Sequence, residues 1–110
     1  LYSLGDFADA RRQGEQGLGI FREIYGEKHP QTAAMLSRLG AQLVCMGDYA
    51  KGRPCLEQAL AINKEIRGQD HEETATSLTH LGISLAMEGQ WKGAGQAIDE
   101  ARQINRQYLA

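Results

Sequence analysis

The sequence has few of the residues that specialised folds and sites require. Its 110 residues include two cysteines, two prolines and 6% aromatic residues. Two cysteines are too few for a disulfide framework, so we expect reduced thiols and a cytoplasmic protein. A net charge of −2 provides no basic face for nucleic acid, and no apolar run is long enough for a membrane span. We therefore expect neither nucleic acid nor membrane as a partner.

The motifs of common catalytic and metal sites are missing as well. Neither Cys-x-x-Cys nor His-Glu-x-x-His occurs, so no zinc site is indicated. Gly14, Gly17 and Gly19 lie inside a helical pattern rather than after a strand, which argues against a dinucleotide-binding fingerprint. No grouping of serine or cysteine with histidine and aspartate indicates a nucleophile. We expect no catalytic residues, no metal and no cofactor, and a protein that is not an enzyme.

The histidines and cysteines have structural explanations instead. His29 and His71 hold equivalent places at two turns, which helix packing keeps about 10 Å apart, so we expect both to make capping hydrogen bonds. Cys45 ends one expected helix and Cys55 lies inside the next, which predicts an offset of about 8–9 Å along the hairpin. That offset exceeds the reach of a disulfide bond.

What the chain does contain is a repeat with a period of 42 residues. Gly5-Asp6-Phe7 returns as Gly47-Asp48-Tyr49 and again as Gly89-Gln90-Trp91. In the same way, Leu36, Leu39, Gly40 and Leu43 return as Leu78, Leu81, Gly82 and Leu85. Self-similarity at one period marks a stacked array of a single supersecondary unit.

Within each period the apolar residues have helical spacing. Leu36, Leu39, Leu43 and Met46 follow i, i+3, i+7 and i+10, which is one face of a helix. Gly47 allows the chain to reverse and Asp48 can cap the next helix, while Asp70 and Glu73 have the spacing of a capping box. Residues 1–4 would end an earlier helix. The expected helices are 6–25, 30–46, 48–67, 72–88 and 90–108, which makes residues 1–110 a single all-α array.

These positions resemble the tetratricopeptide repeat. The matching residues are Leu39-Gly40, Leu43, Gly47-Asp48-Tyr49, Gly52, Leu56 and Ala59, then Leu81-Gly82, Leu85, Gly89-Gln90-Trp91, Ala94, Ile98 and Ala101. The usual repeat has about 34 residues. The longer period, with a second helix that ends in Gly26-Glu27-Lys28-His29-Pro30, is similar to the repeats of kinesin light chain. The resemblance implies an α-solenoid, a superhelix of antiparallel helical hairpins with about two and a half repeats, and we expect it to be a fragment of a longer protein.

The resemblance also implies a binding role. In such arrays the first helices of the hairpins line a concave groove that holds peptides. Carried over by position, Ala34, Thr76 and Ala86 belong to this groove, and the predicted peptide-binding residues are Ser37, Arg38, Ala41, Val44, Cys45, Thr79, His80, Ile83 and Met87. We expect a non-catalytic scaffold that binds a peptide or a partner protein in this groove.

Self-association is the alternative. Trp91, Ile98 and Ile104 lie on the last expected helix, where we expect no further helix to cover them. Exposed apolar patches usually mark contacts, so the ends of the array could join copies of the chain into a homo-oligomer.

The first unit departs from the repeat pattern. Gly14 stands where the later units have Leu56 and Ile98, and Gly17 and Gly19 follow it closely. Three glycines in one helix cost about 3 kcal/mol of helix propensity relative to alanine. We therefore expect the helix over 6–25 to be the least stable part of the chain.

Overall fold

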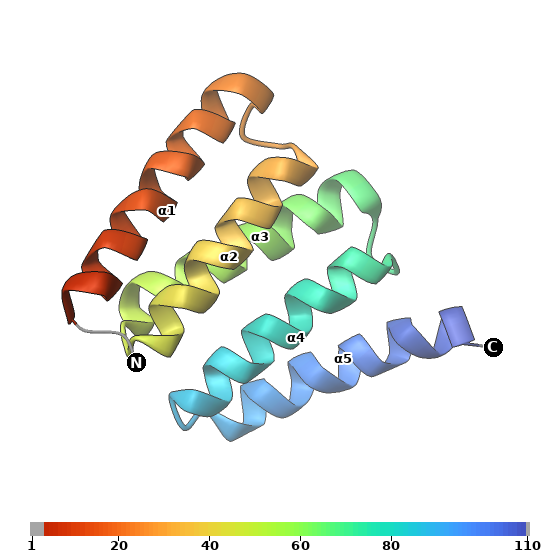
Figure 1. Ribbon diagram of the computed structural model, residues 1–110. Coiled ribbons are helices and arrows are strands. Elements are labelled where there is room, and N and C mark those ends of the chain that lie inside the picture. Colours follow the sequence, from red (N-terminus) through yellow and green to blue (C-terminus); the bar gives the residue numbers. More distant parts are fainter. Residues whose placement is uncertain (1–3, 110) are drawn as a thin grey trace.

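The computed structural model describes residues 4–109, and these form helices joined by short turns (Figure 1). Every expected helix is present, with each end within two residues of its predicted position, and the all-α solenoid is confirmed. The helices are α1 (Leu4–Tyr25), α2 (Pro30–Cys45), α3 (Tyr49–Arg67), α4 (Glu72–Met87) and α5 (Trp91–Leu109).

The helices pack as consecutive antiparallel hairpins. α2 pairs with α3 and α4 with α5, while α1 packs on α2 and α3 packs on α4. α2 and α4, the first helices of two neighbouring hairpins, lie on the same face of the molecule, and α3 passes behind α2 (Figure 1). This arrangement puts one side of α2 and one side of α4 on a shared surface.

Glycine turns close the two hairpins. Gly47 has φ +88°, its N–H donates to Val44 O at 3.0 Å, and Asp48 N–H donates to Leu43 O at 2.9 Å. These two bonds make a Schellman motif, which needs the left-handed conformation that glycine adopts without strain. The Asp48 carboxylate then accepts from Lys51 N–H at 3.3 Å, which confirms it as the predicted N-cap.

Histidines cap the first helices. His29 Nδ1 accepts from Gln31 N–H at 3.1 Å, and His71 Nδ1 accepts from Glu73 N–H at 3.0 Å, so the capping role expected of both histidines is confirmed. The prediction that Asp70 caps α4 is wrong. The helix starts one residue later than a capping box at Asp70 requires, with His71 at the N-cap.

The turn predicted at Gly5-Asp6 is also wrong. Both residues lie inside α1, which already begins at Leu4. An aspartate in the first turn suits the positive end of the helix dipole, so Asp6 is favourable there without a chain reversal. The expected end of an earlier helix falls largely on residues 1–3, outside the described residues.

Of the three glycines in the middle of α1, Gly14, Gly17 and Gly19, two have a packing role that the repeat pattern did not indicate. A Cβ at Gly14 would lie 2.9 Å from Leu39 Cδ1, and a Cβ at Gly17 would lie 3.2 Å from Met35 Cε, both on α2. A Cβ at Gly19 would meet no heavy atom within 4 Å. Gly14 and Gly17 therefore allow α1 to approach α2 closely, and the low stability of α1 stays a prediction.

The apolar end expected at α5 is not observed. Ile104 is 3% exposed and clusters with Ala75 and Leu78 of α4, while Ile98 packs against Gly82 of the same helix. Only Trp91, of the three residues named for this end, is exposed, at 72%. Ile98 and Ile104 belong to the inside of the α4–α5 hairpin, because α4 covers them.

Candidate binding groove

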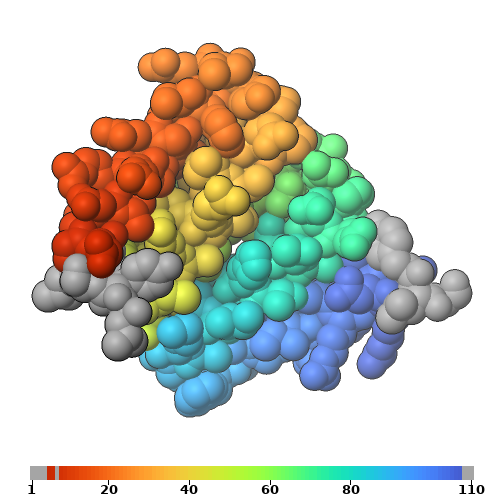
Figure 2. Space-filling view, viewed as in Figure 1, coloured from red at the N-terminus to blue at the C-terminus, as the bar shows by residue number. Residues whose placement is uncertain are grey.

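A surface groove lies between α2 and α4. The face shared by these helices is hollowed between them (Figure 2), and a pocket of about 390 Å³ opens at their N-terminal halves. Five lining residues come from α2, two from the end of α3 and four from α4. They are Pro30, Ala34, Ser37, Arg38, Ala41, Asn63, Arg67, Glu73, Thr76, Ser77 and His80.

Four of the nine predicted peptide-binding residues line this pocket: Ser37, Arg38, Ala41 and His80. Cys45, Ile83 and Met87 are exposed further along the two helices, towards their C-terminal ends. Thr79 is half-buried, and its hydroxyl donates to Ala75 O at 3.0 Å.

The assignment of Val44 to the groove is wrong. This side chain is 4% exposed and packs toward α3, where its Cγ2 would lie 2.8 Å from a Cβ at Gly52. Val44 is one helical turn after Gly40, which also faces α3. It belongs to the core of the α2–α3 hairpin and presents almost no surface to a ligand.

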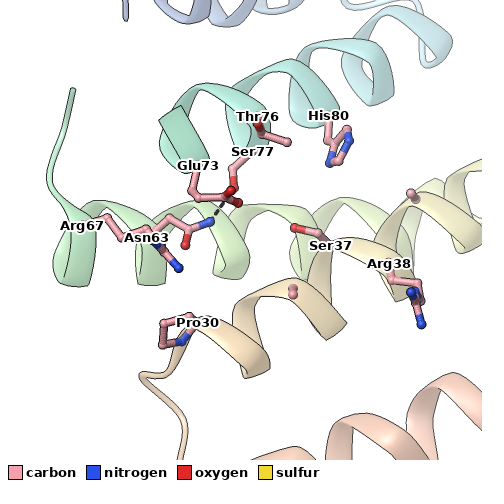
Figure 3. A pocket seen from close by; sticks show the side chains of 11 residues that line it. Pro30, Ser37, Arg38, Asn63, Arg67, Glu73, Thr76, Ser77 and His80 are labelled. Atoms are coloured by element: carbon pink, nitrogen blue, oxygen red, sulfur yellow. Dashed lines mark hydrogen bonds between the residues drawn. The ribbon is translucent and has the colours of Figure 1, made fainter. Parts of the chain in front are cut away.

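The end of α3 contributes lining residues that the sequence analysis missed. Asn63 is buried and its Nδ2 donates to Ser77 Oγ on α4 at 2.8 Å (Figure 3). Arg67 lies one turn further on. The repeat pattern predicted a groove lined by first helices alone, although the polar Asn63 between the apolar Ile62 and Ile66 is a signal of a buried polar contact.

Removing the hydroxyl of Ser77 is expected to destabilise the protein. In Ser77→Ala the buried Asn63 amide loses its acceptor, which should lower the free energy of unfolding by about 1–2 kcal/mol. Urea denaturation measures the loss, with Thr76→Ala as the neighbouring control, because Thr76 is exposed and its hydroxyl bonds only within its own helix. Adding Asn63→Leu should recover part of the loss, and equal losses in Ser77→Ala and Thr76→Ala would contradict the assignment.

The pocket carries more positive than negative charge. Arg38 and Arg67 lie at opposite ends of it (Figure 3), and neither pairs with a carboxylate of the described residues within 4.0 Å. Glu73 is the one acidic residue that lines it. His80 Nδ1 is buried without a hydrogen-bond partner among the described residues. The pocket therefore offers two guanidinium groups for hydrogen bonds to a ligand, while His80 Nδ1 lies buried in its wall.

The cysteines are free thiols. Cys45 is exposed at the end of α2, whereas Cys55 is half-buried, and burial raises the pKa of the Cys55 thiol. Within residues 4–109, no three or more of the His, Cys, Asp and Glu side chains are grouped so that they could hold a metal ion. The described helices include none with the length and apolar character needed to cross a membrane.

Comparison with known proteins places this fold in a family. A family model described as tetratricopeptide repeat matches residues 31–107, and a second tetratricopeptide repeat model matches residues 1–31. The chain belongs to the tetratricopeptide repeat family. The family predicted from the repeated positions is thus confirmed.

The fold is also that of a solved tetratricopeptide structure. The chain is similar to BtubC (BKLC) from P. vanneervenii with a TM-score of 0.87 and 23% sequence identity. The match covers 97% of this chain and 43% of that protein, so the chain spans less than half of its length. BtubC is a kinesin light chain-like tetratricopeptide repeat protein, in line with the 42-residue period. No curated protein matches the sequence.

Proposed function

We propose that this tetratricopeptide array is a non-catalytic, cytoplasmic scaffold that binds a peptide segment of a partner protein in the groove between α2 and α4. The observation that carries the proposal is the pocket of about 390 Å³ between the first helices, with Arg38 and Arg67 at its ends, neither of them paired with a carboxylate within residues 4–109. Tetratricopeptide repeats generally serve as protein-interaction scaffolds.

The groove has the chemistry of a peptide site. Small side chains such as Ala34, Ser37 and Ala41 leave room for a backbone, while the arginines supply donors for polar groups. Further along α4, Ile83 and Met87 are exposed and offer apolar contacts. A site that combines a few polar groups with apolar surface gives both orientation and affinity.

Peptide selection tests the proposal without knowledge of the natural partner. A displayed library of short random peptides is panned against the immobilised chain, and the enriched peptides are titrated by fluorescence anisotropy. We expect the double variant Arg38→Glu, Ile83→Asp to bind them at least about tenfold more weakly, a loss of about 1.4 kcal/mol.

The matched control is Arg106→Glu, which reverses a charge on α5 outside the groove. It should bind the enriched peptides like the unchanged chain. Unchanged affinity of the double variant, with its fold intact by circular dichroism, would refute the groove assignment.

The alternative is self-association through the ends of the array. It requires an exposed apolar surface on α5, and most of the apolar residues expected there are covered by α4. Of the residues that supported it there, Trp91 alone is exposed. The outward face of α5 carries Asp99, Arg102, Gln103 and Arg106 instead.

A further inference from the structure

The two helices that form the groove carry very few charged side chains. Arg38 is the single charged residue of α2, and α4 has acidic residues only in its first turn, at Glu72 and Glu73. From Thr74 to Met87, α4 contains no aspartate, glutamate, lysine or arginine. Because no other charge of these helices is close to it, the exposed guanidinium of Arg38 dominates the potential in the middle of the groove.

The second positive charge of the pocket comes from α3. This helix runs antiparallel to α2, so its last residue, Arg67, lies at the same end of the pocket as Pro30, where α2 begins (Figure 3). Pro30 precedes Arg38 by eight residues, which corresponds to about 12 Å along a helix axis. The pocket therefore presents two exposed guanidinium groups that are separated by about 12 Å along the groove.

One carboxylate opposes the arginines. Glu73 lines the pocket from the first turn of α4, close to the end at which Arg67 lies (Figure 3). The N-termini of α2 and α4 are at this end too, and the positive ends of their helix dipoles offset part of the negative charge. With two arginines against one glutamate, the lining of the pocket favours an anionic ligand.

An extended peptide has a repeat that fits this separation. Its backbone rises about 3.3 Å per residue, and alternate side chains point to the same side. Side chains four residues apart therefore face the same way at a separation of about 13 Å. Those two residues apart span about half of this distance, and those three apart point to opposite sides. The small side chains of Ala34 and Ser37 lie between the two arginines and leave space for the peptide backbone.

We infer that the groove selects an extended segment with two carboxylate side chains four residues apart, one bound by Arg38 and the other by Arg67. The inference rests on the peptide-binding function proposed above. Each contact is a guanidinium–carboxylate hydrogen bond, which can be bidentate. Arg67, although it belongs to a second helix, then determines which spacing of acidic residues the groove accepts.

The peptides enriched in the library selection test this spacing. Those that lose affinity for the Arg38→Glu, Ile83→Asp variant, here called groove-dependent peptides, should share two acidic residues four positions apart. Moving the second acid by one position should weaken binding about threefold, the effect of one exposed ion pair. Fluorescence anisotropy measures the change, and high salt should reduce it because salt screens exposed charges.

Charge exchange assigns the second acid to Arg67. Arg67→Glu should weaken the groove-dependent peptides about tenfold, because attraction becomes repulsion, and a peptide with lysine in place of the second acid should recover most of this loss. The matched control is Lys64→Glu, one turn earlier on α3 and outside the pocket, which should bind like the unchanged chain. Glu73→Gln removes the opposing carboxylate and should strengthen binding about twofold.

The outcomes separate this inference from the proposed function. Groove-dependent peptides without the recurring pair of acids, or an Arg67→Glu variant that binds them unchanged, would overturn the inference and leave the groove assignment intact. A loss in Arg67→Glu that the lysine peptide does not recover would overturn it as well, because the arginine would then act on the fold rather than on the peptide. A selection that yields no groove-dependent peptide would refute the groove assignment itself, and the inference with it.

Discussion

Truncation of Leu56 to alanine is expected to lower the free energy of unfolding by about 3 kcal/mol, the range for fully buried leucines that leave a cavity. Leu56 is 1% exposed and lies against Gly40 at the centre of the α2–α3 hairpin. Chemical denaturation followed by circular dichroism measures the loss. Ile66→Ala is the control on the same helix, because Ile66 is 38% exposed. A loss at Ile66 as large as the loss at Leu56 would contradict this view of the core.

Replacement of Gly40 by alanine is expected to cost about 2 kcal/mol, although alanine is the better helix former by about 1 kcal/mol. The new Cβ would lie 2.8 Å from Leu56 Cγ and 3.0 Å from the Gly52 carbonyl oxygen. A buried side chain and a helix backbone cannot both move away at low cost. The same denaturation experiment measures the effect.

Two controls isolate the steric cause at Gly40. Gly19→Ala makes the same change where nothing lies within 4 Å, so we expect it to raise the free energy of unfolding by about 1 kcal/mol. In a Leu56→Ala background, Gly40→Ala should cost clearly less than in the unchanged chain, because the closest atoms are gone. Strict additivity of the two substitutions would show that the contact is not the cause.

The bounds of the helices could be predicted closely because a glycine marks each turn and recurs at the equivalent position of the next repeat. Gly47 and Gly89 interrupt the apolar pattern at equivalent places, and Gly26 and Gly68 do the same between hairpins. The choice of cap was harder. Asp70 has the more common capping side chain, and only the extended backbone of His71 and its bond from Glu73 N–H show that the helix begins after His71.

The groove was predicted only in part, because spacing along one helix does not say where its neighbour lies. Val44 is three residues from Ala41 and four from Gly40, so the pattern fits either the groove or the core, and the position of α3 decides for the core. Asn63 and Arg67 enter the pocket from α3, and their proximity to Ser37 and Ser77 is a matter of tertiary packing that no local pattern contains.

The close contact of Gly40 with Gly52 has a mechanical consequence. Backbones in direct contact leave no layer of side chains between them, so we expect α2 and α3 to move as one rigid unit. The described residues show no such glycine contact between α3 and α4, where the Asn63–Ser77 hydrogen bond and the Arg53–Glu88 ion pair span the seam. We therefore expect bending of the array to concentrate at this seam. Because the pocket straddles it, a change in the curvature of the superhelix is also a change in the width of the groove.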